Sequence, residues 1–294
     1  MANVSTATGV TATITPNARF LLDPKPSEKY APKQLYDILM GLDVPTPTGG
    51  AVRVKITKYL NTSSTPGKDA NGGPGFAALW HKLGTFAKRS ADSYILPVAI
   101  DSAAQMMSAG MDFSIDRWEL WRFFCGKASP QEIRRALFTA QVAGLVQSSQ
   151  TALQNYCDQQ GGMDCSGFAS VSYGYFRDAG HAGPDASAYR TRGVERKTID
   201  EIRAGDAIVW LQENHIAVID NVMGPFQMSP PLRCKVAEST AGIITAAGPG
   251  VQYSEYAFER DTNSTTRKYI CLRPKLSGGY TQLSATKITV RGNA

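Results

Sequence analysis

The sequence predicts an α+β protein whose helices pack on an antiparallel β-sheet. From about residue 116 the chain shows two segments with apolar residues at helical spacing, and four strand-like runs follow after residue 205. Turn residues separate these runs, so that neighbouring strands can pair in an antiparallel manner. This order of helices and strands favours an α+β domain over a doubly wound fold.

An N-terminal region, residues 1–115, precedes this pattern and carries no motif that indicates its role. Apolar periodicity and strand-like alternation still predict several elements within it. These are a short strand within 10–16, a helix over 31–43, a half-buried strand over 51–60, a helix over 76–89 and a strand over 93–100.

Residues 116–285 are predicted to form one domain, with 286–294 as a tail. Its second helix has a favourable start, because Ser129 suits the N-cap and Pro130 suits the first helical position. The expected elements are helices over 116–126 and 129–147 and strands over 206–212, 215–222, 233–240 and 267–274.

The composition excludes several classes of protein. With 43% hydrophobic and 19% charged residues, the chain is globular rather than disordered or fibrous. No run of eighteen apolar residues occurs, so no transmembrane segment is expected. The N-terminus lacks the charged start and the apolar block of a secretory signal. We therefore expect a cytoplasmic protein, or one exported by a non-classical route to the periplasm or the extracellular space.

The net charge of +6 mildly favours a partner with an anionic surface. The basic residues are scattered, however, and their densest stretch, residues 189–197, has the composition of a solvated loop. No module of basic and aromatic residues accompanies the charge, so no nucleic-acid partner is expected.

Five cysteines form a sparse set without a C-x-x-C motif. A disulfide scaffold or a structural zinc site would need closer spacing. We therefore expect no metal, no other cofactor and mostly reduced, buried thiols. Only Cys165 has a neighbourhood that calls for another explanation.

The stretch GGMDCSGFASVSYGYF places Cys165 at the expected start of a helix. Asp164 is a favourable N-cap residue, and apolar residues at helical spacing predict about three turns, ending near Gly180. The N–H groups and the positive end of the helix dipole favour a thiolate there. The same N–H groups, with Ser166 and Gly167, are candidates to bind an oxyanion. This feature alone leaves a buried structural thiol as the alternative.

A nucleophilic thiol needs a base, and the chain offers three histidines. His81 lies on an amphipathic helix and His181 in a loop, where exposure is the ordinary expectation. His215 opens the strand HIAVIDNV, in which alternation places Ala217 on the face of His215. Because Ala217 is small, we expect the helix that begins at Cys165 to pack over that face.

Three ordered motifs resemble the NlpC family of papain-like cysteine peptidases. They are MDCSGFASVSYGYF, then IRAGDAIVW, then NHIAVIDNV. The resemblance covers roughly residues 129–275 and implies a papain-like domain with Cys165 as the nucleophile and His215 as the general base. Gly205 and Asp206 match a family turn, which we interpret as structural.

The family's third catalytic residue, commonly a histidine one strand later, is missing, because no histidine follows His215. Glu238 shares a strand face with Val236 and is the acidic residue best placed for this role, since a carboxylate can orient the imidazole. An exposed strand carboxylate is the alternative for Glu238. Asp220 and Asn221 are weaker substitutes.

Two further positions follow from the resemblance. A tyrosine upstream of the cysteine often lines the family's site, and Tyr156 is the nearest candidate. Ala204 stands where a proline is more usual in the family turn.

The resemblance implies hydrolysis of amide bonds in bacterial cell-wall peptides, typically near a γ-D-glutamyl linkage. The expected partner is therefore a peptidoglycan-derived peptide, and a cognate inhibitor or a delivery machinery is left unspecified. Two alternatives stay open. One is a deamidase, transglutaminase-like or acyltransferase toxin that uses the same Cys-His pair. The other is a catalytically inactive module that binds the cell wall.

Overall fold

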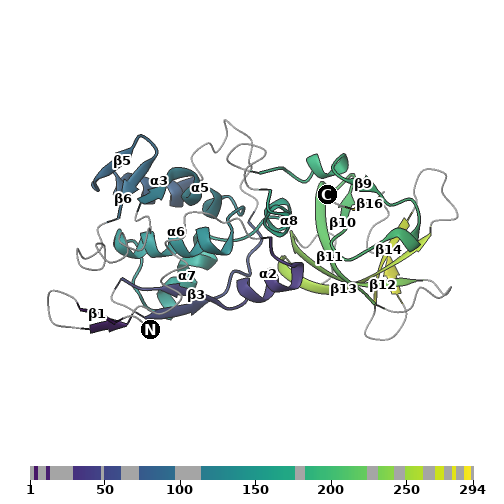
Figure 1. The fold of residues 1–294 in the computed structure, drawn as a ribbon, viewed down its shortest axis with the longest axis horizontal. Helices are drawn as coiled ribbons and strands as arrows, with labels where there is room; N and C mark the ends of the chain where they lie inside the picture. The colour runs from purple at the N-terminus through teal and green to yellow at the C-terminus, as the bar shows by residue number, and fades with distance from the viewer. Residues whose placement is uncertain are drawn as a thin grey trace. The chain divides into compact units, whose positions relative to one another are not determined.

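The computed structural model describes most of the chain (Figure 1). The described residues are 3–5, 11–13, 29–47, 50–60, 73–96, 114–175, 183–223, 231–241, 249–260, 269–274, 280–282 and 288–292. The chain divides into two compact units. The first contains Met1–Glu28, Ile38–Ile56 and Asn61–Gly162, and the second contains Lys29–Asp37, Thr57–Leu60 and Met163–Ala294.

The first unit combines helices with small antiparallel sheets. Its helices are α3 (Gly73–Leu83), α5 (Arg117–Phe124), α6 (Pro130–Val142) and α7 (Gln150–Gln160). Its strand pairs are β1 (Asn3–Ser5) with β2 (Thr11–Thr13) and β3 (Leu42–Pro45) with β4 (Ala51–Val54). A three-stranded sheet joins β5 (Lys88–Ser90), β6 (Ser93–Ile95) and β7 (Ser114–Asp116).

Helix α6 begins as the sequence predicts. Ser129 is the N-cap, Pro130 occupies the first turn, and Ser129 and Glu132 form a reciprocal capping box. Buried ion pairs then tie α6 to α5, in which Arg122 contacts Glu132 and Glu119 contacts Arg135. Local capping and these pairs together fix the two helices to each other.

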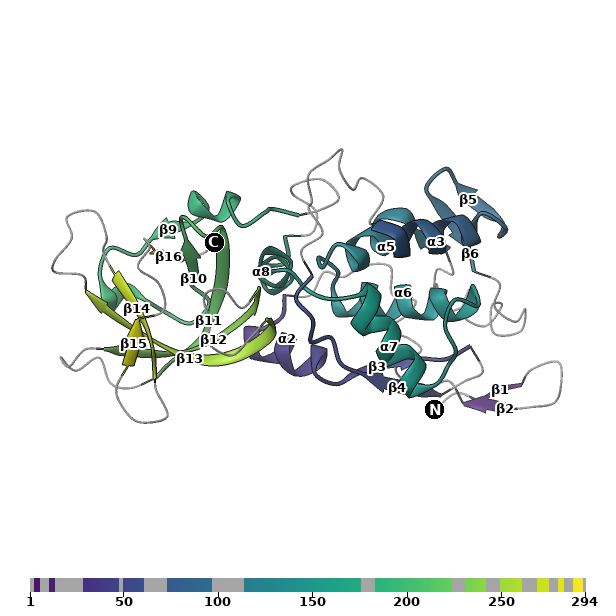
Figure 2. The same ribbon diagram turned by 180° about the vertical axis from the view of Figure 1, so that it is seen from behind.

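The second unit is built on an eight-stranded antiparallel sheet, which confirms the predicted α+β class. In spatial order the strands are β15 (Tyr280–Gln282), β14 (Tyr269–Pro274), β13 (Gly250–Arg260), β12 (Leu232–Thr240), β11 (His215–Met223), β10 (Ala207–Trp210), β16 (Ile288–Gly292) and β9 (Val194–Glu195). Helix α8 (Cys165–Tyr173) lies beside β11 and β12 in both ribbon views (Figure 2). The remaining helical elements are α2 (Pro32–Leu39), which begins in this unit, η1 (Ala188–Arg190) and η2 (Ile199–Glu201).

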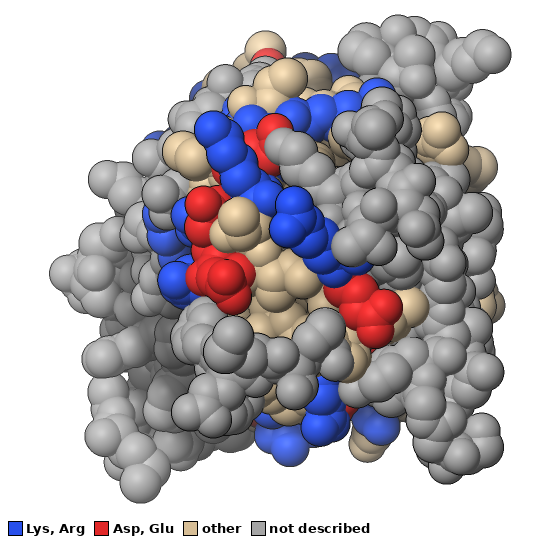
Figure 3. Space-filling model, turned by 90° about the vertical axis from the view of Figure 1, so that its right-hand side faces the viewer, with Lys and Arg blue, Asp and Glu red and all other residues tan. Residues whose placement is uncertain are grey.

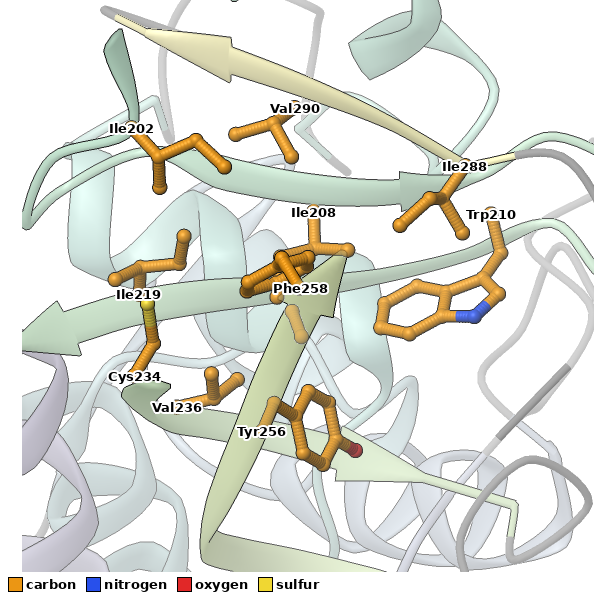
Figure 4. Close-up of a cluster of buried hydrophobic side chains, with 11 residues drawn as sticks. Ile202, Ile208, Trp210, Ile219, Cys234, Val236, Tyr256, Phe258, Ile288 and Val290 are labelled. Carbon is orange, nitrogen blue, oxygen red and sulfur yellow. The ribbon is translucent and has the colours of Figure 1, made fainter. Parts of the chain in front are cut away.

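The two faces of this sheet carry separate apolar clusters. Figure 4 shows one of them, in which Trp210 and Tyr256 lie near each other among aliphatic side chains from β10 to β13 and β16. On the other face Cys165 and the rest of α8 pack against alternate residues of β10 and β11, such as Val209 and Ile216. The alternation of side chains along each strand thus assigns neighbouring residues to different faces.

Charges on the outer surface of the sheet compensate one another locally. In Figure 3 the basic and acidic side chains of the described residues are interspersed. On β12, for example, Arg233 and Lys235 both bond Glu255 on β13, at 2.6 and 3.3 Å.

Several boundaries differ from the sequence prediction. The strand expected over 51–60 ends at Val54, and the helix expected to reach Gly180 ends at Tyr173, because Gly174 adopts a left-handed C-cap with φ 74°. The residues predicted as a tail contain β16, which pairs with β10.

The domain division differs as well. The predicted domain over 116–285 contains helices α5, α6 and α7, which fold with the first unit. The second unit instead takes in two short segments of the N-terminal region, Lys29–Asp37 and Thr57–Leu60. None of the helices described above has both the length and the apolar character to cross a membrane.

Candidate active site

Cys165 is the first residue of α8, as the sequence predicts. Asp164 is the N-cap, and its carboxylate accepts a hydrogen bond from the backbone N–H of Gly167. The hydroxyl of Ser166 also donates to this carboxylate, at 3.1 Å. Asp164 therefore faces the helix start, which leaves the sulfur at the positive end of the helix dipole.

His215 is the first residue of β11 and is 5% exposed. A turn delivers it, and the preceding Asn214 has φ 52°, in the left-handed region that asparagine tolerates better than most residues. The cross-strand partner of His215 is Trp210, whose ring centroid lies 5.0 Å from that of the imidazole. The strand register and the indole together fix the position of the imidazole.

Cys165 and His215 meet at the end of β11. Cys165 is close enough to His215 to help raise the pKa of the imidazole, and its sulfur lies 3.9 Å from the carbonyl oxygen of Asn214, the residue before His215. The expected packing face is wrong, however. Helix α8 packs on the face of Ile216 and Val218, whereas Ala217 belongs to the opposite cluster. The sulfur and the imidazole come together because Cys165 is the first residue of α8 and His215 is the first residue of β11.

Glu238, on β12, is the third member of this group. Its Oε2 lies 2.6 Å from Nε2 of His215, and its side chain is 0% exposed. Full burial excludes the alternative of an exposed strand carboxylate. Because Glu238 engages Nε2, Nδ1 is the ring nitrogen that is left to bond Cys165.

The charges around His215 favour its imidazolium form. Burial by itself lowers the pKa of His215, but hydrogen bonds to Cys165 and Glu238, together with their negative charges, outweigh burial and raise the pKa to about 10. The group is thus arranged to keep a proton on the imidazole at neutral pH, beside a sulfur at a helix N-terminus.

A tyrosine that sequence reasoning missed also contacts the thiol. Tyr59 is half-buried beside Cys165, and burial together with the charges of Cys165 and Asp164 raises the pKa of Tyr59. Tyr59 lies in the segment Thr57–Leu60, which belongs to the second unit. The backbone of this segment pairs with Met163. The N–H of Met163 donates to the carbonyl oxygen of Lys58 at 3.0 Å, and the N–H of Leu60 donates to the carbonyl oxygen of Met163 at 3.1 Å.

The candidate Tyr156 has its own surroundings. It belongs to α7 in the first unit, where burial and the neighbouring thiol of Cys157 raise its pKa. Within the second unit the tyrosine beside Cys165 is Tyr59, and the role of Tyr156 stays a prediction. The only signal for Tyr59 was its place on a segment with strand-like alternation, which does not indicate a long-range partner.

The N-cap reduces the number of backbone N–H groups at the start of α8 that could bind an oxyanion. The N–H of Gly167 is already donated to Asp164, so it is not available to a substrate while the cap holds. The N–H of Cys165 lies at the first position of the helix, where no intrahelical acceptor exists. Cys165 is therefore the better candidate to supply a backbone donor.

The two weaker substitutes for the third residue have different surroundings. Asp220 accepts hydrogen bonds from the Tyr253 hydroxyl at 2.8 Å and from the Lys33 backbone at 2.9 Å, and Asn221 is exposed. These two residues are therefore separate from the Cys165 group.

Asp206 is structural, as expected. Its carboxylate accepts two hydrogen bonds from Arg196 and one from the backbone of Arg203, and Gly205 before it has φ 85°. His81 is exposed on α3, and His181 lies outside the described residues.

Within the described parts of the chain, no group of three or more histidine, cysteine, aspartate or glutamate side chains is arranged to hold a metal ion. Comparison of the chain with protein-family models, with curated proteins and with solved structures gave no match.

Proposed function

We propose that the chain is a thiol hydrolase of the papain-like, NlpC type that cleaves amide bonds. The observation that carries the proposal is the continuous contact from Cys165 through His215 to Glu238, with 2.6 Å between imidazole and carboxylate. A nucleophile, a base and a group that orients the base are the elements of triad chemistry. The order of these residues along helix and strands agrees with the resemblance found in the sequence.

In the proposed reaction, the thiolate of Cys165 attacks the carbonyl carbon of the scissile amide, and a C–S bond forms. Charge develops on the carbonyl oxygen, and the proposed hydrogen-bond donors to it are the N–H of Cys165 and the hydroxyl of Tyr59. The imidazolium of His215 donates its Nδ1 proton to the leaving nitrogen as the C–N bond breaks. A thioester and a free amine result.

Hydrolysis of the thioester completes the cycle. The neutral imidazole of His215 accepts a proton from a water molecule, whose oxygen attacks the thioester carbonyl. The C–S bond breaks, a carboxylic acid leaves, and the thiolate and imidazolium are restored. Glu238 stabilises the imidazolium in both half-reactions and holds the ring so that Nδ1 faces the sulfur.

We further propose peptidoglycan stem peptides as the substrate, because the motif resemblance points to that class. The test is digestion of purified stem peptides that contain a γ-D-glutamyl linkage, with products identified by mass spectrometry. The wild type is expected to cleave them and Cys165→Ala is not. Full-rate cleavage by Cys165→Ala would contradict the thiol mechanism, and loss of ammonia or gain of an acyl group without chain scission would favour a deamidase or a transferase.

The alternative of an inactive wall-binding module is weakened by Glu238. The absence of a third histidine was its main support, and a buried carboxylate bonded to His215 fills that position.

A further inference from the structure

Tyr256 contacts the side of Glu238 that faces away from His215. It lies on β13, is completely buried, and donates its hydroxyl hydrogen bond to Oε1 of Glu238. The other oxygen, Oε2, bonds His215. Each oxygen of this carboxylate therefore has a defined partner, one of them the proposed base and the other a phenol.

We infer that Tyr256 is a positioning residue, which holds Glu238 in the orientation that binds His215 and thereby sustains the imidazolium. The inference rests on the proposed function of Cys165, His215 and Glu238, and it adds Tyr256 as a fourth residue. In this proposal Tyr256 acts through Glu238, to which its hydroxyl donates.

The physical argument starts from the burial of Glu238. A carboxylate that is 0% exposed has lost its hydration and depends on donors in the protein to stay charged. Rotation about the last bond of a glutamate is broad, so a single hydrogen bond leaves its orientation loosely defined. A second donor on the other oxygen restricts that rotation and stabilises the charged form.

The surrounding packing shows that the contact is built by tertiary structure. The cross-strand partner of Tyr256 is Cys234, whereas that of Glu238 is Gln252, so the phenol reaches along the sheet face to the carboxylate. Trp210 packs edge-on to the Tyr256 ring at 6.2 Å and 82°, in the cluster of Figure 4, and also contacts the His215 ring. One indole thus braces both ends of the His215–Glu238–Tyr256 chain.

The test is the titration of the His215 imidazole by nuclear magnetic resonance. The chain contains three histidines, so its imidazole signals are few, and His215→Ala assigns the relevant one. In the wild type the midpoint is expected near the pKa of about 10. Tyr256→Phe keeps the ring and removes the donor, and it is expected to lower that midpoint by about one pH unit.

Tyr253→Phe is the matched control. Tyr253 lies on the same strand, but its hydroxyl donates to Asp220 rather than to Glu238. The control is expected to leave the His215 midpoint unchanged. Equal shifts in the two variants would overturn the inference, because they would indicate a general effect of losing a hydroxyl from β13.

A second background separates action through Glu238 from a packing effect. In Glu238→Gln the charged acceptor is absent, so adding Tyr256→Phe is expected to leave the His215 midpoint where Glu238→Gln put it. The same shift in both backgrounds would overturn the inference. If Tyr256→Phe does not fold, the hydroxyl proton of Tyr256 is measured in the wild type instead. A slowly exchanging proton close to the Glu238 side chain supports the inference, and the absence of such a proton overturns it.

Iodoacetamide modification of Cys165 distinguishes this inference from the proposed function. If wild type and His215→Ala react at the same rate, the Cys165–His215 pair fails and the inference fails with it. If these two differ and Tyr256→Phe titrates like the wild type, only the role of Tyr256 is overturned.

Discussion

Nε2 of His215 and Oε2 of Glu238 lie 2.6 Å apart, and neither side chain is more than 6% exposed. A buried carboxylate and a buried imidazole at this distance stabilise each other most strongly when the imidazole carries a proton on both nitrogens. The thiol at the start of α8 also contributes to the raised pKa of this imidazole. The charge of Glu238 on β12 therefore affects the reactivity of Cys165 through His215.

His215→Ala is expected to slow the modification of Cys165 by iodoacetamide at neutral pH by roughly tenfold or more, since the imidazolium that favours the thiolate is gone. Peptide mass spectrometry assigns the label to Cys165 among the five cysteines. His81→Ala is the control, because His81 is exposed on α3 and is expected to leave the rate unchanged. Equal rates in the wild type and His215→Ala would contradict the ion pair.

The pH dependence of stability follows from the raised pKa of His215. Its contribution to the free energy of unfolding is fully present below pH 6.5 and is lost as the pH rises through about 10. The loss is expected to be on the order of a few kcal/mol. Denaturant titrations between pH 6 and 11 measure it as the difference between wild type and His215→Ala. A difference that does not change over this range would exclude the raised pKa.

Two substitutions of Glu238 separate charge from packing. Glu238→Gln keeps the shape but loses the charge, and it is expected to lower amide hydrolysis roughly a hundredfold. Glu238→Ala leaves His215 and the Tyr256 hydroxyl without their buried acceptor, and it is expected to cost about 3 kcal/mol of unfolding free energy.

The matched control for these variants is Asp220→Asn. Asp220 was the weaker candidate for the third residue, and its carboxylate bonds Tyr253 instead. Activity measured on stem peptides is expected to survive this change. A loss as large as that of Glu238→Gln would mean that the third residue has been misassigned.

Local signals in the sequence were sufficient for the starts of two helices, α6 and the helix α8 that carries the nucleophile. The N-caps at Ser129 and Asp164 bond residues three positions away, so a short stretch determines them. The order of helices and strands likewise predicted an antiparallel sheet. Glu238 could be selected because a strand face is set by alternation within one segment.

The remaining parts of the site depend on contacts between distant segments. Tyr59 joins the site because Leu60 pairs with Met163, about a hundred positions further along, and no local pattern encodes that pairing. Strand β13, which carries Tyr256, was not predicted, because its buried and half-buried residues do not alternate. The predicted packing face of α8 was wrong for a related reason. Alternation defines the two faces of a strand but does not determine which of them a helix covers.

Tyr59→Phe is expected to lower kcat roughly tenfold with a smaller change in KM, because the hydroxyl would act on charge that develops during the reaction. Tyr253→Phe is the matched control and is expected to behave like the wild type, since its hydroxyl donates to Asp220. Steady-state kinetics on one stem peptide compare the two. An equal loss of kcat in both variants would contradict a role of the Tyr59 hydroxyl in the reaction.

Gly250→Ala tests whether the segment Thr57–Leu60 must stay seated for the site to work. Gly250 has φ 132°, and an added Cβ would meet the carbonyl oxygen of Thr57, which also accepts the Val251 N–H at 3.0 Å. The variant is expected to lose about 1–3 kcal/mol of unfolding free energy and to show the kinetic defect of Tyr59→Phe as well.

Gly144→Ala is the control, since Gly144 has φ 71° and its Cβ would meet nothing within 4 Å. It carries the backbone strain without the clash, so it is expected to lose stability but to keep the wild-type kcat. A Gly250→Ala chain with an unchanged kcat would show that Tyr59 is held at Cys165 by other contacts.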